Sequence, residues 1–370
     1  MNVNLFNPEW TISEKKEYSK LLEYNEAPTE KEFHKYVQNN KKLYFSSCGK
    51  SSLYAILKSN NVGKNDEVII PCYCCESVAY PIRHMMASPI IADIEISDLN
   101  ISVNSILNLI SPKTKAIIVP SIYGNPANII EITEKVQDNI LIINDLAQSY
   151  GATLNCLPME CYGDAGFFSC GPGKQLTGAG GSVFWLNNIA YNPILKDQNK
   201  LMNMSLHNSF YYSRVNVDEN IHSPYYRLFS NQYKLLNSNI FRVNKKATPL
   251  DLNVMLALMN SYSSKLKQKR IIMDEIKTLS NNKGYRVISE QRGTGSPVKI
   301  VLLFNSVELC NDAKKVLNNC KIYFSNGYKK VNGIEKNLLN GYNHVLGKII
   351  EIPLEIEKKK YLLDALNQIN

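Results

Sequence analysis

Short apolar segments alternate with segments of helical periodicity through the first half of the chain, and this alternation constrains the fold most strongly. The segments that resemble strands are Leu43–Ser46, Glu67–Pro71, Ile90–Ile94, Ala116–Pro120, Ile140–Asn144, Ala165–Ser169 and Ser182–Leu186. The helical segments between them include Ser51–Ser59, Val78–Met86 and Ile129–Val136. This pattern predicts an α/β fold with a mostly parallel sheet covered by helices on both faces. The loops after the strands, where ligands of such sheets bind, are the place to look for functional residues.

The later part of the chain predicts a second, smaller unit. After Thr248-Pro249, apolar residues recur at helical spacing from Leu250 onward, which predicts a long helix. Two strands and a terminal helix are expected beyond it, at Lys299–Phe304, Ile349–Ile352 and Ile356–Ile369. We therefore expect a large α/β domain over residues 1–246, with an N-terminal helical segment at Ser13–Tyr24, and a small α+β domain over residues 247–370.

Composition and charge exclude several classes of protein. The chain has 370 residues, of which 44% are hydrophobic and 20% charged, values typical of a globular protein. No apolar run approaches the roughly 18 residues that would span a bilayer, so no membrane association is expected. The net charge of +9 comes mainly from scattered lysines, which does not favour nucleic-acid binding. The odd number of cysteines, nine, and the lack of a signal peptide predict reduced thiols and a cytoplasmic protein.

The cysteine and histidine residues do not predict a metal site. Cys72-Tyr73-Cys74-Cys75 is a dense cluster, but a structural zinc site needs four ligands, usually in two spaced pairs. The five histidines form no pair with metal-ligand spacing. We interpret the cysteines as buried structural thiols and expect no metal.

Gly49-Lys50-Ser51 follows the first predicted strand and resembles the end of a nucleotide-binding P-loop. The full motif needs a glycine five residues before Gly49, where this chain has Tyr44. A strand that leads into such a helix start can still bind one phosphate group, because free amides and the helix dipole point towards it. An ordinary helix start is the alternative interpretation.

Two further predicted strands are followed by residues that could take part in catalysis. Asp145 follows the apolar segment Ile140–Asn144, either as a carboxylate at the ligand-binding edge or as the cap of a helix. Lys174 follows the strand Ala165–Ser169 within a stretch where seven of the 18 glycines are concentrated. A lysine fixed in such a turn is unlike an ordinary surface lysine. A phosphate site, an aspartate and a lysine are together the groups that a pyridoxal phosphate (PLP) enzyme requires.

The order and spacing of these residues resemble the DegT-type sugar aminotransferases, a family with the PLP-dependent transferase fold type I. Six blocks carry the resemblance: Cys48-Gly49-Lys50-Ser51-Ser52-Leu53, Lys64–Pro71, Ile110–Ile117, Tyr123-Gly124-Asn125-Pro126, Asn144-Asp145-Leu146-Ala147-Gln148 and Phe168–Lys174. The resemblance implies a seven-stranded large-domain sheet and a smaller C-terminal domain. It also implies a homodimer with shared active sites, a nucleotide-linked keto sugar as substrate and glutamate as amino donor, in the biosynthesis of surface polysaccharide or related products.

The resemblance also implies roles for individual residues. Lys174 would form the internal aldimine with PLP and transfer the proton, and Asp145 would pair with the pyridine nitrogen. Gln148 would approach the ring hydroxyl. The phosphate would be held by Gly49, Lys50, Ser51 and Ser169, and Asn244 is the candidate for an asparagine that reaches the partner's site.

Several positions depart from the family pattern. Cys75 replaces the aromatic residue that stacks on the cofactor ring, and Lys50 replaces a phosphate-binding threonine, whose contact geometry differs from that of an ammonium group. Ser121 and Tyr150 occupy positions where histidine is common. These differences lie around the ring and on the substrate side. They therefore leave open two alternatives: a PLP lyase, dehydratase or transferase acting on a non-sugar substrate, and a non-catalytic PLP-binding paralogue.

Overall fold

The computed structural model describes residues 10–21, 26–187, 192–211 and 242–369. Seven strands form one sheet in the order β1-β9-β8-β5-β4-β2-β3. Strand β9 is antiparallel to its neighbours β1 and β8, and the other pairs in the sheet are parallel. The strands are β1 (Leu43–Ser46), β2 (Glu67–Pro71), β3 (Ser88–Ala92), β4 (Thr114–Pro120), β5 (Leu141–Asp145), β8 (Ala165–Ser169) and β9 (Ser182–Leu186). The predicted mostly parallel, seven-stranded sheet is confirmed.

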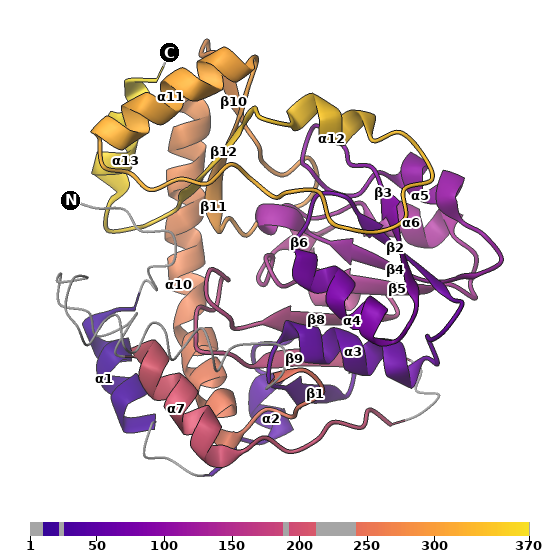
Figure 1. Cartoon of the computed structure of the whole chain (residues 1–370). Helices are drawn as coiled ribbons and strands as arrows, with labels where there is room; N and C mark the ends of the chain where they lie inside the picture. Colours follow the sequence, from indigo (N-terminus) through magenta and orange to yellow (C-terminus); the bar gives the residue numbers. More distant parts are fainter. Residues whose placement is uncertain (1–9, 22–25, 188–191, 212–241, 370) are drawn as a thin grey trace.

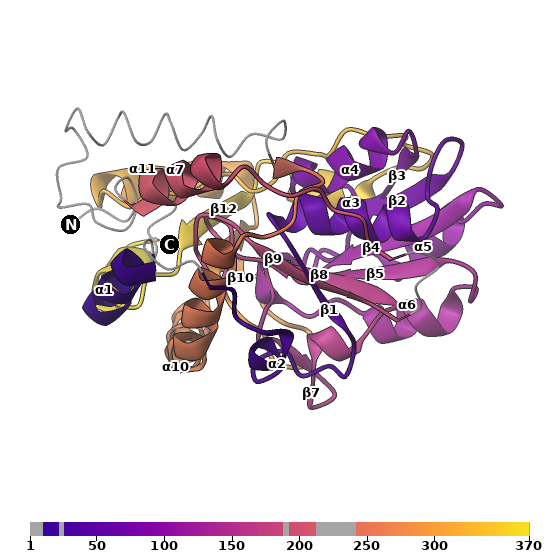
Figure 2. The ribbon, with the colours of Figure 1, turned by 90° about the horizontal axis from the view of Figure 1, so that it is seen from below.

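Helices cover both faces of this sheet, because alternate residues of each strand point to opposite sides. On β2, Ile70 belongs to the same core as helices α3 (Gly49–Ser59) and α4 (Ala79–His84). Its neighbour Ile69 belongs to the core that contains α5 (Val103–Leu109) and α6 (Ile129–Lys135). Figure 2 shows α3 and α4 on one side of the strands and α6 on the other. Helix α5 was not predicted from the sequence.

Short elements connect these layers. They are the helices α1 (Ile12–Leu21), α2 (Glu30–Phe33) and α7 (Lys200–Phe210), the 3-10 turns η1 (Glu76–Val78), η2 (Ile122–Gly124) and η3 (Met159–Cys161), and the hairpin strands β6 (Thr153–Leu154) and β7 (Leu157–Pro158). Helix α1 begins one residue before the predicted segment Ser13–Tyr24, of which residues 22–24 lie outside the described ranges.

The long helix α10 (Pro249–Leu279) joins the large sheet to the small domain. Pro249 occupies its first turn after Thr248, as the sequence predicts, and Thr248 also forms a capping box with Asp251 that was not predicted. The stretch Leu250–Leu266 contributes to the core of the large domain, whereas Ile272–Ile276 packs in the core of the small one. The predicted division after residue 246 therefore falls at the start of a helix that both domains share (Figure 1).

The small domain contains an antiparallel sheet of strands β10, β11 and β12. Its elements are β10 (Tyr285–Val287), β11 (Lys299–Phe304), α11 (Val307–Asn319), α12 (Asn340–Val345), β12 (Ile349–Pro353) and α13 (Lys359–Asn367). Strands β11 and β12 and the terminal helix match the predicted segments closely, whereas β10, α11 and α12 were not predicted. Among the helices of the described ranges, none is both long and apolar enough to cross a membrane.

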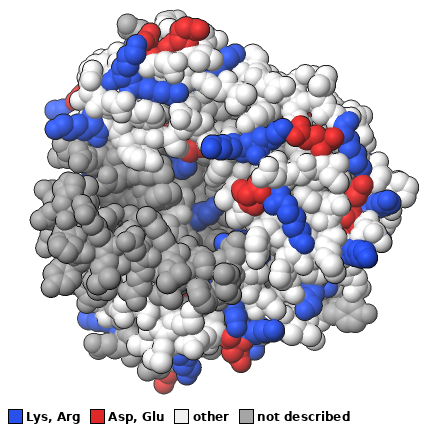
Figure 3. Space-filling view, in the orientation of Figure 1, with Lys and Arg blue, Asp and Glu red and all other residues white. Residues whose placement is uncertain are grey.

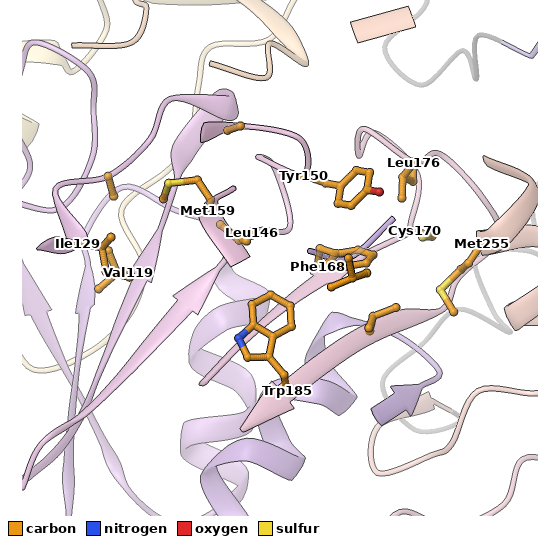
Figure 4. Packing of buried hydrophobic residues seen from close by; sticks show 14 of the residues in the cluster. Val119, Ile129, Leu146, Tyr150, Met159, Phe168, Cys170, Leu176, Trp185 and Met255 are labelled. Carbon is orange, nitrogen blue, oxygen red and sulfur yellow. The ribbon is translucent and has the colours of Figure 1, made fainter. Parts of the chain in front are cut away.

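The packing around Phe168 fixes the end of β8, where the site lies (Figure 4). The ring centroids of Phe168 and Tyr150 are 4.7 Å apart, and both residues are buried. On the neighbouring strand, Trp185 lies over Gly166, where an added Cβ would come within 2.5 Å of the indole ring. Glycine is therefore required at this point for β8 and β9 to pair. The close packing of Phe168 and Gly166 therefore fixes the end of β8, from which the next turn begins.

Candidate active site

A cavity of about 270 Å³ opens at the carboxyl ends of β4, β5 and β8. Its wall combines loops that follow these strands with the start of α3 and the segment before η1. Seven of the residues predicted from the sequence line it: Gly49, Lys50, Cys75, Asp145, Gln148, Ser169 and Lys174. In the face of the molecule shown in Figure 3, the surface is hollowed near the centre, and Lys or Arg atoms are visible inside the hollow.

Asp145 ends β5 and is 5% exposed. Its Oδ1 accepts a hydrogen bond of 2.9 Å from the Ala147 amide, and it forms no ion pair with any described residue. Burial raises the pKa of Asp145, and the charge of Lys174 opposes this shift only in part. A buried carboxylate in this position is stabilised by a cation that enters the cavity.

Lys174 lies in the glycine-rich turn that follows β8. Its amide donates to the Gly171 carbonyl at 3.2 Å, and its carbonyl accepts from the Thr177 hydroxyl at 2.5 Å. Gly173 has φ +73°, a conformation that side chains other than glycine rarely adopt. The turn thus holds the lysine backbone firmly, and Lys174 lines the cavity together with Asp145.

The opposite end of the cavity is formed by the start of α3 and the end of β8. At Gly49 an added Cβ would be 3.3 Å from the Ser169 Cβ, so glycine allows the helix start to approach the strand end. Lys50 and Ser169 also line this end. Ser51 is placed differently: its buried hydroxyl donates to the Lys245 carbonyl and accepts from the Lys245 amide, each at 2.9 Å. Its hydroxyl therefore anchors a neighbouring loop and does not line the cavity.

Arg242 is a residue of this wall that sequence reasoning missed. It is 2% exposed, and its guanidinium donates to the carbonyls of Ala179 and Ser47. Gly180 makes room for it, since an added Cβ would lie only 1.9 Å from the Arg242 Nη2 atom. Arg242 adds a second cation to the part of the cavity that contains Lys50, an arrangement suited to a phosphate group.

Cys75 and Gln148 line the remaining wall. The Cys75 sulfur accepts from the Ser77 hydroxyl at 3.0 Å, so sulfur occupies the position where the family has an aromatic ring. The Gln148 side chain accepts from the Tyr123 amide at 3.3 Å and donates to the Tyr328 hydroxyl at 2.9 Å. Ser121 also lines the cavity, whereas Tyr150 packs in the core and donates to the Tyr36 carbonyl.

Asn244 is not among the residues that line the cavity of its own chain. It has φ +62°, and its carbonyl accepts from the Lys196 amide at 2.9 Å. Its side-chain Oδ1 is buried and has no hydrogen-bond partner in the described part of the chain. Its predicted role in a partner's site therefore stays a prediction.

These residues fit PLP. The buried Asp145 carboxylate, which forms no ion pair with a described residue, suits a protonated ring nitrogen. The start of α3, with Lys50, Ser169 and Arg242, suits the phosphate. Lys174 lines the same cavity, and its charge acts on Asp145. No group of three or more His, Cys, Asp or Glu residues in the described ranges is arranged to hold a metal ion.

The sheet and its topology are those of the PLP-dependent transferase fold type I, and Lys174 and the buried Asp145 lie at one cavity of this fold. Over its full length the chain is similar to the Streptococcus pneumoniae protein Spr1654, assigned as a sugar aminotransferase, with a TM-score of 0.76 at 19% identity, covering 100% of this chain and 98% of that one.

The chain belongs to the DegT/DnrJ/EryC1/StrS aminotransferase family, which it matches over residues 15–228. Aminotransferases of this family use PLP. Both the predicted family and the predicted cofactor are thereby confirmed.

Two curated relatives are similar to part of the chain. The UDP-N-acetyl-3-dehydro-α-D-glucosamine 3-aminotransferase of Acidithiobacillus ferrooxidans is 34% identical over 135 residues, 36% of this chain and 37% of the relative. The GDP-4-keto-6-deoxy-D-mannose 3-dehydratase of Escherichia coli O55:H7 is 32% identical over 113 residues, 30% of this chain and 29% of the relative. The chain thus spans only about a third of the length of these relatives.

Proposed function

We propose that this protein is a PLP-dependent aminotransferase that converts a nucleotide-linked keto sugar into an amino sugar, with glutamate as the amino donor. The observation that carries the proposal is the presence of Lys174 and the buried Asp145 at one cavity, in a chain of an aminotransferase family. The similarity to a nucleotide-sugar 3-aminotransferase supports the substrate class. We place the enzyme in the cytoplasm, in the biosynthesis of surface polysaccharide or a related product.

When bound, PLP supplies an electron sink that stabilises negative charge at the substrate carbon next to the transferred nitrogen. Asp145 holds the proton on the ring nitrogen, because its carboxylate gains a cationic partner in a buried site. The Lys174 amine takes the proton from the substrate carbon as a general base and later returns it. The glycine turn holds the backbone from which this amine extends.

The other residues of the cavity would bind the cofactor and orient it. Gly49, Lys50 and Ser169 hold the phosphate with the help of Arg242, and Ser51 contributes by fixing the loop that contains Lys245. Gln148 and Cys75 line the cavity, where Gln148 would orient the ring through its amide and Cys75 would lie beside the ring. The enzyme is a homodimer in which Asn244 reaches the partner's site. Its buried Oδ1, which has no hydrogen-bond partner among the described residues, supports this assignment, since such an atom is costly unless assembly gives it a partner.

Spectroscopy and mass spectrometry test the proposal directly. The purified protein, incubated with PLP and reduced with borohydride, should carry the cofactor covalently on Lys174. The Lys174→Ala variant should bind PLP without this modification and lose activity. Lys315→Ala, which removes a 75% exposed lysine, is the matched control and should behave as the wild type. A wild-type protein that takes up no PLP, or a fully active Lys174→Ala variant, would contradict the proposal.

A second candidate function is a dehydratase on a similar sugar. The similarity to the GDP-4-keto-6-deoxy-D-mannose 3-dehydratase favours it, as does the altered ring face at Cys75. Incubation with ¹⁵N-labelled glutamate and a panel of nucleotide-linked keto sugars separates the two. An aminotransferase transfers the label to the sugar, whereas a dehydratase yields a deoxy sugar without nitrogen. Labelled products from non-sugar ketones alone would indicate a different substrate class, and no turnover with PLP bound would indicate a non-catalytic paralogue.

A further inference from the structure

The Gln148 side chain is held from two sides by residues of different domains. Its Oε1 accepts from the Tyr123 backbone amide at 3.3 Å, and its Nε2 donates to the Tyr328 hydroxyl at 2.9 Å. A peptide amide can only donate, so the contact with Tyr123 defines which end of the Gln148 amide is oxygen. The Nε2 atom has a second hydrogen, and Gln148 lines the cavity.

Tyr123 adopts an unusual backbone conformation to make this contact. Its φ of 56° and ψ of 16° lie in the left-handed region, which is unfavourable for a residue with a Cβ. Strain of this kind persists only where the surroundings impose it, and it is concentrated at functional sites. Here the Tyr123 side chain is anchored on the small domain, since its hydroxyl donates to the buried Glu351 carboxylate on β12.

Tyr328 lies on the segment between α11 and α12, which crosses from the small domain to the large one (Figure 1). This crossing segment, residues 322–339, forms single β-bridges on both sides. Ser325 pairs with Glu351 on β12, and Lys330 and Ile334 pair with residues of the large domain. Gly327 has φ +78°, and an added Cβ there would come within 2.3 Å of the Tyr73 hydroxyl. The segment is therefore packed closely against the large domain at the residue before Tyr328.

A partly exposed cation, the Lys299 ammonium, contacts both tyrosines. The rings of Tyr123 and Tyr328 stack with centroids 5.9 Å apart. The Lys299 ammonium lies 5.8 Å from the Tyr123 ring centroid and 5.9 Å from that of Tyr328, and it pairs with Glu351. Cation–π contacts of this length attract the ammonium weakly to both rings, and its ion pair with Glu351 holds it beside them.

We propose that Tyr328 is a positioning residue: it fixes the Gln148 amide so that the second Nε2 hydrogen is directed at an oxygen anion in the cavity, the ring hydroxyl of PLP. The proposal rests on the proposed function for the identity of the ligand. Tyr328 acts through Gln148 and is not among the residues that line the cavity. In this way the small domain sets the orientation of a cofactor-facing group on the large domain.

The test compares Tyr328→Phe with Tyr73→Phe. Both variants remove one hydroxyl from the same tyrosine cluster, but the Tyr73 hydroxyl bonds to Tyr123 and not to Gln148. Visible circular dichroism, normalised to bound PLP, reports the orientation of the ring. We expect Tyr328→Phe to change this signal and to weaken PLP binding about two- to tenfold, the effect of one neutral hydrogen bond. Tyr73→Phe should retain the wild-type signal.

A double-mutant cycle with Gln148→Leu shows whether Tyr328 affects the bound cofactor through Gln148. If Tyr328 acts through Gln148, Tyr328→Phe has no further effect on the signal in the Gln148→Leu background. An equal effect in both backgrounds, or an unchanged signal in Tyr328→Phe, would overturn the inference.

Crystal structures of the ligand-free protein test the positioning without the cofactor. We expect one Gln148 conformation in the wild type, with Nε2 on the Tyr328 hydroxyl, and a turned or divided side chain in Tyr328→Phe. Should that variant not fold, the wild-type structure decides alone, because a Gln148 turned away from Tyr328 overturns the inference. Failure of the wild type to take up PLP would instead refute the proposed function and leave this structural result standing.

Discussion

Two buried aspartates of this molecule show how similar burial can serve different ends. Asp145, at the end of β5, is 5% exposed, and Asp251, in the first turn of α10, is fully buried. Burial would raise the pKa of both, and for Asp145 it does so. For Asp251, the hydrogen bond and charge of His207, with the charge of Arg242 and the Thr248 amide, reverse the shift and lower the pKa to about 2.

The difference lies in the partners that each carboxylate has within the chain. Asp251 accepts from His207 at 2.9 Å, from the Thr248 amide at 2.9 Å and from Asn203 at 3.2 Å. Asp145 accepts one backbone hydrogen bond and faces a cavity. A buried charge that the chain itself satisfies is structural, whereas one left for a ligand to satisfy indicates a binding site.

The largest effect should come from Asp145→Asn. The amide keeps the Oδ1 acceptor for Ala147 but cannot stabilise a proton on the ring nitrogen, so kcat should fall by roughly 10²–10⁴-fold. Because the charge is costly in the empty site, the ligand-free variant should melt at or above the wild-type temperature. Steady-state kinetics and calorimetry measure both. An active variant, or one that is strongly destabilised, would remove the contrast with Asp251.

Asp251→Asn should have the opposite effects: it should lower the stability of the fold and leave the activity of the folded protein almost unchanged. Replacing one oxygen by an NH₂ group sets a donor against the donors of His207, Thr248 and Asn203, and breaking such a buried pair costs about 3 kcal/mol. Chemical denaturation should show this loss, while the activity of the folded fraction stays within about twofold. Asp274→Asn, at a 73% exposed position on the same helix, is the control and should change stability by less than about 0.5 kcal/mol.

The pH dependence of stability should separate the two residues again. The folded-state pKa of Asp251 lies below its ordinary value of 3.8, so its stabilisation is present above about pH 4 and is lost as the pH falls towards 2. This loss amounts to about 2 kcal/mol. For Asp145 the raised pKa means that protonation favours the fold as the pH falls. Relative to the wild type, Asp251→Asn should therefore lose less stability between pH 5 and 2, and Asp145→Asn should lose more. Urea denaturation at several pH values between 5 and 2 would measure the free energy of unfolding of each variant. If this free energy falls with pH equally in the wild type and both variants, both assignments are refuted.

Local patterns explain which parts of the molecule could be predicted from the sequence. The apolar segment before Asp145 and the glycine turn around Lys174 are short-range signals, and the structure brings both residues to one cavity. Helix α11 had a usable signal that was missed: Ser306 caps it by accepting from the Leu309 amide. Strand β10, with three residues, is too short to show alternation.

Long-range contacts explain the rest. Arg242 bonds to Ser47, 195 residues away, so nothing near it in the sequence marks it as part of the site. The Ser51 hydroxyl was assigned to the phosphate from its motif, but it bonds to a loop that is equally distant in sequence. The motif predicts the position of the backbone. The use of each hydroxyl depends on what the rest of the chain places beside it.

The smallest predicted effect tests Arg242 through its neighbour. In Gly180→Ala the new Cβ would lie 1.9 Å from Arg242 Nη2, and since a guanidinium is the flexible end of a side chain, it should move while the fold survives. If Arg242 binds the cofactor phosphate, PLP affinity should fall about three- to tenfold, less than the loss of a whole charge-assisted hydrogen bond, because the guanidinium is displaced and not removed. Gly63→Ala, where the nearest atom is 4.0 Å away, is the control and should bind PLP as the wild type does. Fluorescence titration with PLP measures the affinities, and adding Arg242→Gln to Gly180→Ala should then cause little further loss. Unchanged affinity in Gly180→Ala, with a crystal structure showing the guanidinium displaced, would mean that Arg242 only braces the loops around Ala179 and Ser47, as Asp251 braces α7 against α10.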